Sequence, residues 1–345
     1  MLIKYAKEIA RQWVIEEASS RPDFFGAFFH GSVNYLSDDD VLPPVSDVDI
    51  MIVLSNLSPP EKLGKFLYQG VLLEVSYLSN DQIHSPEQVL GQCHLAGSFR
   101  YPSVILDSTG RLTEIQATVS TNFAKRKWVY KRCEHARERV ISGCHLNEAD
   151  SLPDQVIPWL FPTGITTHIL LVAGLKNPTV RRRYAAVRGL LADYGRLDFY
   201  ENLLEALGCA DMTRNRVERH LEALTEAFDV AKTVRNPPFS FASDLTDTAR
   251  AIAIDGSREL IESGYHRDAV FWLIVTYCRC QKTLSLHEDR RMRDRFSPGF
   301  RNLLDDVGIT SFGDIQQRTA KLQESLPRIW EVVETIIAVN PGIED

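Results

Sequence analysis

The sequence lacks a continuous apolar run of the roughly 18 to 20 residues that a transmembrane helix needs. Residues 1–8 include Lys4, Lys7 and Glu8, so they lack the apolar core of a signal peptide. Apolar residues make up 44% of the chain and charged residues 25%, which is typical of a globular protein. We therefore expect a cytoplasmic protein that does not act at a membrane.

Cysteine pairs and the common phosphate-binding motifs are also missing. The six cysteines include no Cys-x-x-Cys pair, so the sequence indicates neither zinc-finger spacing nor a disulfide framework, and we expect free thiols. His84 and His94 lie ten residues apart without an acidic pattern, which favours surface or core histidines. Neither Gly-x-x-x-x-Gly-Lys-Ser/Thr nor Gly-x-Gly-x-x-Gly occurs, which excludes the P-loop and dinucleotide fingerprints.

An excess of basic residues is absent as well. The formal net charge is −7, and residues 1–115 account for it with 8 basic and 15 acidic side chains (8 − 15 = −7). A long polyanion such as tRNA or DNA favours a basic surface. We therefore do not expect a nucleic acid as a partner.

The most informative pattern is a pair of aspartates that opens an apolar segment. Asp47 and Asp49 begin the strand-like run at residues 47–54. Residues i and i+2 of a strand share a face, so both carboxylates point the same way. Two carboxylates this close repel each other unless a cation lies between them, and Mg²⁺ is the ion that prefers such oxygen ligands.

Two further features accompany this pair. The apolar run at residues 24–30 ends in Gly31 and Ser32, a small-residue turn where backbone N–H groups can approach phosphate oxygens. Glu74 stands in the middle of the apolar run at residues 71–78, where an unpaired carboxylate is costly to bury. A metal shared by Asp47, Asp49 and Glu74 would explain its position. A phosphate cradle beside metal-binding carboxylates indicates phosphoryl or nucleotidyl transfer.

At this point the chain resembles the DNA polymerase β-like nucleotidyltransferase superfamily. The resemblance rests on His30-Gly31-Ser32, Asp47-Val48-Asp49 and Glu74, and it covers about the first third of the chain. It implies two Mg²⁺ ions held by the three acids, a nucleoside triphosphate (ATP as the expected donor) seated on the Gly31-Ser32 turn, and attack on the α-phosphorus. The spacer between Ser32 and Asp47 is long, and residues 38–44 look like an insertion.

The coarse pattern predicts two domains. Residues 1–115 are expected to form an α/β nucleotidyltransferase domain around a small mixed sheet, and residues 116–345 a larger all-α domain that selects the acceptor. The expected strands lie at residues 24–30, 47–54, 71–78 and 103–107. The expected helices lie at residues 4–20, 58–68, 80–95, 114–142, 165–176, 178–194, 198–207, 213–235, 246–263, 268–286 and 313–338, with a rigid loop at 237–241.

An Asp-x-Asp domain followed by a helical domain resembles antibiotic nucleotidyltransferases, which modify hydroxyls of aminoglycosides or lincosamides. The resemblance implies an unidentified small-molecule acceptor and a general base, for which Glu134, Asp244 and Asp268 are candidates. Two alternatives remain open. One is an antitoxin-type nucleotidyltransferase that modifies a protein partner; Arg214 and His220 superficially match the Arg-x5-His motif of its toxin. The other is a nucleotide-binding regulator without turnover.

The triphosphate also needs cations that residues 1–115 scarcely supply. We expect at least one basic residue from two clusters to face the Gly31-Ser32 turn across a cleft between the domains. The candidates are Lys125, Arg126, Lys127, Arg181, Arg182 and Arg183.

Overall fold

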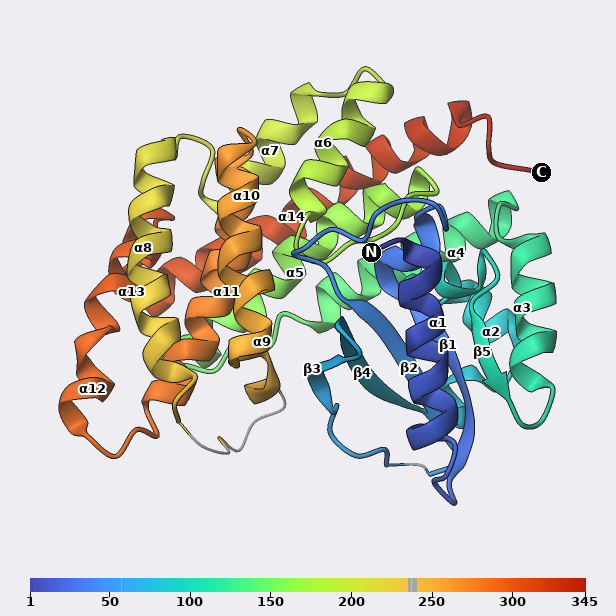
Figure 1. Ribbon diagram of the computed structural model, residues 1–345. Coiled ribbons are helices and arrows are strands. Elements are labelled where there is room, and N and C mark those ends of the chain that lie inside the picture. The colour runs from blue at the N-terminus through green and yellow to red at the C-terminus, as the bar shows by residue number, and fades with distance from the viewer. Residues whose placement is uncertain (57, 235–236, 238–240) are drawn as a thin grey trace. The chain divides into compact units, whose positions relative to one another are not determined.

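A computed structural model of the chain describes residues 1–56, 58–234, 237 and 241–345. The chain divides into two compact units (Figure 1). We call residues 1–135, 175–177 and 341–345 the sheet unit, and residues 136–174 and 178–340 the helical unit. Most of the loop expected at residues 237–241 lies outside the described residues.

The sheet unit contains a small mixed sheet, as the sequence predicts. Its strand order is β3-β4-β2-β1-β5; β2 and β4 run parallel, and the other neighbours are antiparallel. The elements of this unit are α1 (Ile3–Trp13), β1 (Phe24–His30), β2 (Val48–Leu54), β3 (Gly64–Tyr68), β4 (Val71–Ser79), α2 (Pro86–Gly91), β5 (Val104–Asp107), α3 (Arg111–Asn122) and the first part of α4 (Arg126–Ser142).

Both faces of this sheet are covered. Successive side chains of β1 point to opposite faces, yet Phe28 and Phe29 are both fully buried. Phe29 belongs to the core that includes Ala6, Ala10 and Trp13 of helix α1. Phe28 packs instead against Phe99, with ring centroids 4.6 Å apart. This double burial explains why β1, β2 and β4 read as nearly continuous apolar runs in the sequence.

The long spacer between Ser32 and β2 folds against helix α1. Lys4 and Lys7 pair with Asp39 and Asp38, each at 2.9 Å. The backbone N–H of Ile3 donates to the Asp40 carbonyl at 2.9 Å. The acidic part of the insertion is therefore attached to the N-terminal helix.

The helix expected at residues 58–68 is wrong, because residues 64–68 form strand β3. Gln69 and Gly70 both have positive φ, at 47° and 80°, and they form a tight hairpin turn into β4. The hairpin pairs Lys65 with Glu74. Pro60 and Glu61 suit a first helical turn, but the backbone pairing with β4 decides the local structure.

The single helix expected at residues 114–142 is also wrong. The structure has two helices, α3 and α4, with a break at residues 123–125. The expected domain boundary at 115/116 falls inside α3, and the sheet unit extends to His135 in α4. Helix α3 packs on β5 and α2, so it belongs with the sheet.

The remainder of the chain is mainly helical, as expected. Helix α5 begins at Leu152, earlier than expected, because Pro158 and Pro162 inside it disguise the helical pattern. Helices α12 and α13 were not predicted. The elements of the helical unit are the rest of α4, α5 (Leu152–Ala173), α6 (Arg183–Asp193), α7 (Asp198–Leu207), α8 (Arg214–Ala231), α9 (Asp247–Arg250), α10 (Gly256–Glu262), α11 (His266–Leu284), α12 (Arg290–Arg295), α13 (Ser297–Asp306) and α14 (Phe312–Val339).

Helices α5 and α11 form the core of this unit. Helix α5 is long and apolar enough to cross a membrane by length and composition, but 72% of its most apolar window is buried inside the protein. Helix α11 packs on α5, α8 and α10. A core helix of a globular unit therefore accounts for the apolar character of α5.

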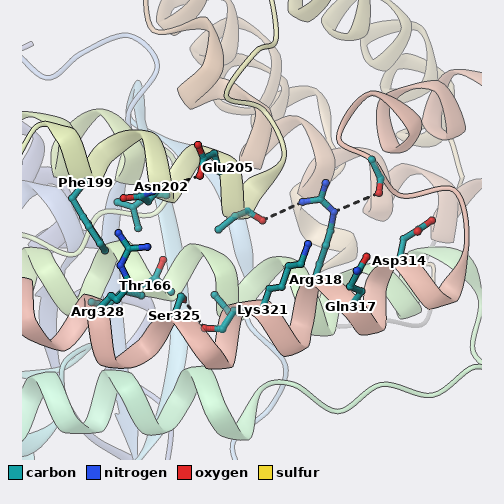
Figure 2. A pocket seen from close by; sticks show the side chains of 15 residues that line it. Thr166, Phe199, Asn202, Glu205, Asp314, Gln317, Arg318, Lys321, Ser325 and Arg328 are labelled. Atoms are coloured by element: carbon teal, nitrogen blue, oxygen red, sulfur yellow. Dashed lines mark hydrogen bonds between the residues drawn. The ribbon is translucent and has the colours of Figure 1, made fainter.

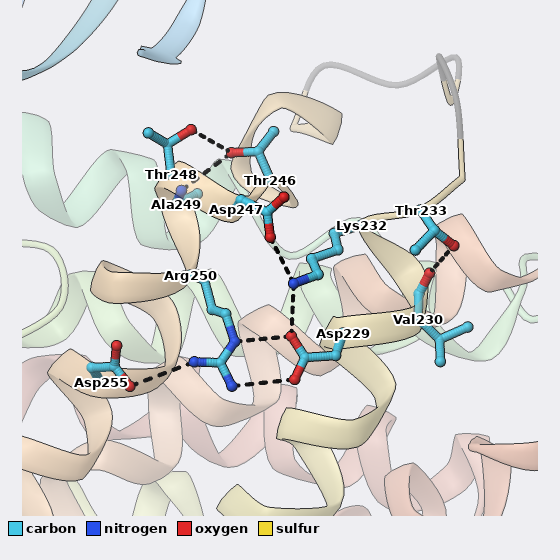
Figure 3. A network of polar contacts seen from close by, with 10 residues as sticks. All are labelled: Asp229, Val230, Lys232, Thr233, Thr246, Asp247, Thr248, Ala249, Arg250 and Asp255. Atoms are coloured by element: carbon cyan, nitrogen blue, oxygen red, sulfur yellow. Dashed lines mark hydrogen bonds and ion pairs between the residues drawn. The ribbon is translucent and has the colours of Figure 1, made fainter. Parts of the chain in front are cut away.

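A polar network joins the end of α8 to α9 (Figure 3). Arg250 makes a two-pronged contact with Asp229, at 2.8 and 3.1 Å. Lys232 lies 3.1 Å from Asp229 and 2.6 Å from Asp247. The network therefore connects the C-terminal end of α8 to helix α9.

Candidate functional site

The structure brings Asp47, Asp49 and Glu74 together. Strands β2 and β4 run parallel, and their register places Asp49 beside Glu74. Asp47 lies one residue before β2 and shares the face of Asp49. One oxygen from each carboxylate lies within 4.8 Å of the other two. The three acids therefore form a compact cluster of oxygen ligands where β2 begins beside the middle of β4.

The Gly31 turn lies directly against this cluster. Strand β1 ends with His30 paired to Asp49, and Gly31 follows with φ of +68°. A Cβ at Gly31 would clash with the Asp49 carboxylate. The Asn34 side chain donates to the Phe29 carbonyl at 2.8 Å and so closes the turn onto the strand. Only glycine satisfies both the backbone angle and the close approach.

Two lysines that the sequence reasoning missed complete the cluster. Lys65 on β3 contacts both Asp47, at 2.6 Å, and Glu74. Lys62 lies 2.9 Å from the other oxygen of Glu74. With every group ionised, three carboxylates and two ammonium groups leave one negative charge. The hairpin turn at Gln69-Gly70 is the sequence signal that could have placed Lys65 opposite Glu74.

The charges in this cluster shift one another's ionisation. Burial raises the pKa of Asp49 well above its ordinary value, and the neighbouring carboxylates of Asp47 and Glu74 raise it further. Burial acts on Glu74 in the same sense, but Lys65 and Lys62 outweigh it and lower the pKa of Glu74 to about 2. Asp49 is therefore the carboxylate whose negative charge is least compensated.

His30 is a neutral neighbour of the cluster. Burial lowers the pKa of its imidazole to about 4, although the charge of Glu74 acts in the opposite direction. Its Nδ1 lies 2.6 Å from the Ser98 hydroxyl oxygen. The ring therefore adds no positive charge at neutral pH.

The six basic residues expected to contact phosphate have mixed surroundings. Arg126 pairs with Asp345 at 2.7 Å, and Arg181 donates to the Gly256 carbonyl at 2.6 Å. Arg183 is only 2% exposed and packs on the Phe271 ring, which is unsuitable for a solvent-facing clamp. For Lys125, Lys127 and Arg182 the expected phosphate contact stays a prediction. The cations at the carboxylates are Lys62 and Lys65.

The three candidate general bases differ in environment. Glu134 is exposed on α4, and Asp244 pairs with Arg279 at 2.9 Å. Asp268 is 4% exposed in the first turn of α11, and burial raises its pKa to about 6. The ion pair of Asp244 and the burial of Asp268 both argue against a carboxylate that is free to accept a proton from an acceptor hydroxyl.

The Arg-x5-His pattern on α8 does not form one constellation. Arg214 pairs with Glu218 at 2.8 Å, whereas His220 is buried and lies 2.7 Å from Asp306. Residues six apart on a helix point in different directions. The two side chains are therefore occupied by separate contacts.

The helical unit contains a cavity of about 500 Å³ (Figure 2). Helix α14 contributes Arg318, Lys321 and Arg328, and helix α7 contributes Asn202 and Glu205. Arg318 also donates to the carbonyl of Val307. The cavity has the size of a small-molecule site, and all of its lining residues belong to the helical unit.

No protein-family model and no curated protein matches this chain.

Proposed function

We propose that the protein is a metal-dependent nucleotidyltransferase that transfers a nucleoside monophosphate, with ATP as the expected donor, to a hydroxyl of a small-molecule acceptor. One observation carries the proposal: three carboxylates, from β2, from β4 and from the residue before β2, converge within 4.8 Å beside a glycine turn with positive φ. The superfamily resemblance of the sequence supports the same reading.

The donor set suits Mg²⁺. Three carboxylates provide hard oxygen ligands, and the raised pKa of Asp49 shows that Lys65 and Lys62 do not outweigh the burial of its charge and the neighbouring carboxylates. Asp47, Asp49 and Glu74 would hold the metal, and Lys65 now contacts two of these three residues. When bound, Mg²⁺ would neutralise the triphosphate and favour departure of pyrophosphate.

The chain's own residues would position the reactants. The turn at Gly31 and Ser32 offers small side chains and backbone N–H groups to the triphosphate. Lys62 and Lys65, which contact the carboxylates, would supply positive charge to the phosphate oxygens if a metal balanced the carboxylates in their place. In the reaction an acceptor oxygen forms a bond to the α-phosphorus while the bond to pyrophosphate breaks, and the hydroxyl proton passes to a base.

A second function is favoured by the position of Lys65. Its ammonium lies against Asp47 and Glu74 in the same way that a metal would, and it is only 9% exposed. If this ion pair were permanent, no metal would bind at the carboxylates. The protein would then bind nucleotide as a regulator without catalysing transfer. The two functions differ in whether a metal displaces this lysine.

The test combines binding and turnover on the purified full-length chain. Thermal shift with each of the four ribonucleoside triphosphates and Mg²⁺ identifies the donor, since a ligand at 100 times its Kd stabilises by about 2.7 kcal/mol. Pyrophosphate release is then measured with aminoglycosides and lincosamides as acceptors, with Asp49→Asn as the inactive control.

Release that depends on one acceptor and on Asp49 supports the transferase. ATP binding without release, across the whole panel, favours the regulator. Release only in the presence of a co-purified ribonuclease favours the antitoxin. Equal stabilisation, or none, by all four nucleotides refutes the donor assignment.

A further inference from the structure

A second group of metal-ligating side chains lies in the sheet unit, apart from the carboxylates. Cys93 and His94 occupy the turn that follows α2, and His135 projects from α4. Their ligand atoms, one from each residue, lie within 4.8 Å of one another. We propose that Cys93, His94 and His135 form a binding site for a zinc-class transition-metal ion.

The spacing of these atoms suits tetrahedral coordination. The Cys93 sulfur lies 3.3 Å from His135 Nδ1. A tetrahedral zinc ion, with Zn–S of about 2.3 Å and Zn–N of about 2.0–2.1 Å, places its sulfur and nitrogen ligands about 3.5 Å apart. The His94 and His135 rings stack with centroids 5.5 Å apart, so both imidazoles lie on the same side of the turn.

The tautomer of His135 is also suitable. The Cys93 backbone N–H donates to His135 Nδ1 at 3.3 Å, so this nitrogen is unprotonated and its lone pair points towards the turn; a bound metal would replace this hydrogen bond. A neutral imidazole binds a metal through such a lone pair. Metal binding would release the thiol proton of Cys93 to solvent and leave a thiolate ligand.

The surrounding structure fixes the distance between the turn and α4. The guanidinium of Arg132, one helical turn before His135, is buried and donates to the carbonyls of Leu90 and Phe123. Cys93 is only 3% exposed, whereas His94 and His135 retain contact with solvent. The ion therefore has a path from solvent, and water can complete its coordination.

The ligand chemistry separates this site from the carboxylates. One thiolate and two imidazoles suit zinc and related borderline ions, whereas three carboxylates suit Mg²⁺. The proposal is therefore independent of the proposed transferase function. Its rival is a metal-free Cys93–His135 pair that activates the thiol, and the experiment distinguishes the two.

The test uses Co²⁺ as a spectroscopic probe on the full-length, chelator-treated protein in the presence of Mg²⁺. The expected result is one cobalt per chain, visible bands of tetrahedral cobalt, and a near-ultraviolet thiolate-to-cobalt charge-transfer band. Zn²⁺ should displace the cobalt and abolish these bands. Because Cys93→Ser changes a buried residue, His135→Asn serves as a second variant, with circular dichroism to establish that each is folded.

The chain provides a matched control. Cys144 and His145 form a second Cys-His-Leu sequence, and the structure, over the residues it describes, groups them with no third ligand. The double change Cys144→Ser/His145→Asn should keep the charge-transfer band, as should Asp49→Asn. His135→Asn should weaken Zn²⁺ binding by about 100-fold or more, beyond the usual effect of losing an outer-shell partner.

Two results would overturn the proposal. One is a wild-type protein that binds cobalt without a thiolate band; the other is a band that survives in folded Cys93→Ser. Rapid thiol labelling of Cys93 that Zn²⁺ does not slow would assign the reactive-thiol role instead.

Discussion

Lys65 and Glu74 face each other across the β3–β4 hairpin, and the same ammonium group also lies 2.6 Å from Asp47. The lysine thus connects two of the three carboxylates from a third strand. Burial lowers the pKa of Lys65, but the charges of Asp47 and Glu74 outweigh it and raise that pKa. The lysine remains charged, and it provides the positive charge that the acids need in the absence of a metal.

Lys65→Met should destabilise the metal-free protein by about 3 kcal/mol, because removing one partner of a buried ion pair leaves uncompensated charge. Mg²⁺ should restore much of this loss, since the dication takes the place of the ammonium group. Urea denaturation in chelator measures the loss of stability, and denaturation in excess Mg²⁺ measures how much of it is restored. Lys62→Met, which removes a contact to Glu74 but leaves the Lys65 ammonium group between Asp47 and Glu74, should show a smaller effect. An identical Mg²⁺ response in wild type and Lys65→Met would show that the lysine and the metal do not compete.

Asp49→Asn should have the opposite effect on stability in chelator. Its pKa is raised in the folded state, so ionisation of Asp49 at neutral pH costs folding free energy that asparagine avoids. The variant should therefore be more stable than wild type at pH 8. The gain should shrink as the pH falls through the raised pKa of the folded state, and it should disappear below about pH 4, where the carboxyl becomes protonated in the unfolded chain as well. Mg²⁺-dependent stabilisation and nucleotidyl transfer should be lost. A destabilised variant, or one that keeps its Mg²⁺ response, would argue against a metal at Asp49.

Gly31→Ala tests the contact between the turn and the carboxylates. The change incurs both a backbone cost at φ of +68° and a clash with Asp49. Gly70→Ala is the matched control, because Gly70 has φ of +80° but its added Cβ would meet no atom of the described residues within 4 Å. Gly70→Ala should cost about 1 kcal/mol and leave Mg²⁺–nucleotide binding unchanged. Gly31→Ala should cost more and weaken that binding, as measured by calorimetric titration. Equal losses of stability and of nucleotide binding in the two variants would mean that Gly31 matters only for its backbone angle and not for its contact with Asp49.

The sequence predicts the carboxylate cluster because Asp49 and Glu74 interrupt apolar strands and Asp47 directly precedes one of these strands. Asp49 and Glu74 stand in runs whose burial fixes the strand register, and a fixed register brings them side by side. Lys65 was missed because Pro60 and Glu61 resemble a helix start, and a short edge strand has too few residues to show its alternation. Its position follows from pairing with β4, which local propensity does not encode.

The metal-ligating group at Cys93 could not be predicted for a related reason. Its third member, His135, is separated from the Cys93-His94 pair by 40 residues that include α3, and no short spacing links them. Only the packing of α4 beside the turn after α2 brings the three together. Conversely, α5 was predicted too short because its internal prolines hide a helix that tertiary burial stabilises.

The buried acid Asp268 should make the stability of the protein depend on pH. Burial raises its pKa to about 6 in the folded state, although the Tyr200 hydroxyl bonds to the carboxylate, while one carboxylate oxygen has no hydrogen-bond partner among the described residues. An aspartate in an unfolded chain has a pKa of about 3.9. The folded protein therefore binds the proton more tightly, and the stability that this provides is complete below pH 4 and is lost as the pH rises through 6.

Asp268→Asn should remove this loss and gain up to about 2–3 kcal/mol relative to wild type between pH 4 and pH 7. Urea denaturation of both proteins at pH 5, 6, 7 and 8 measures the difference, which should grow up to pH 7 and then level off. A difference that stays constant over this range would mean that Asp268 is ionised in the fold, and its burial would then need a cationic partner.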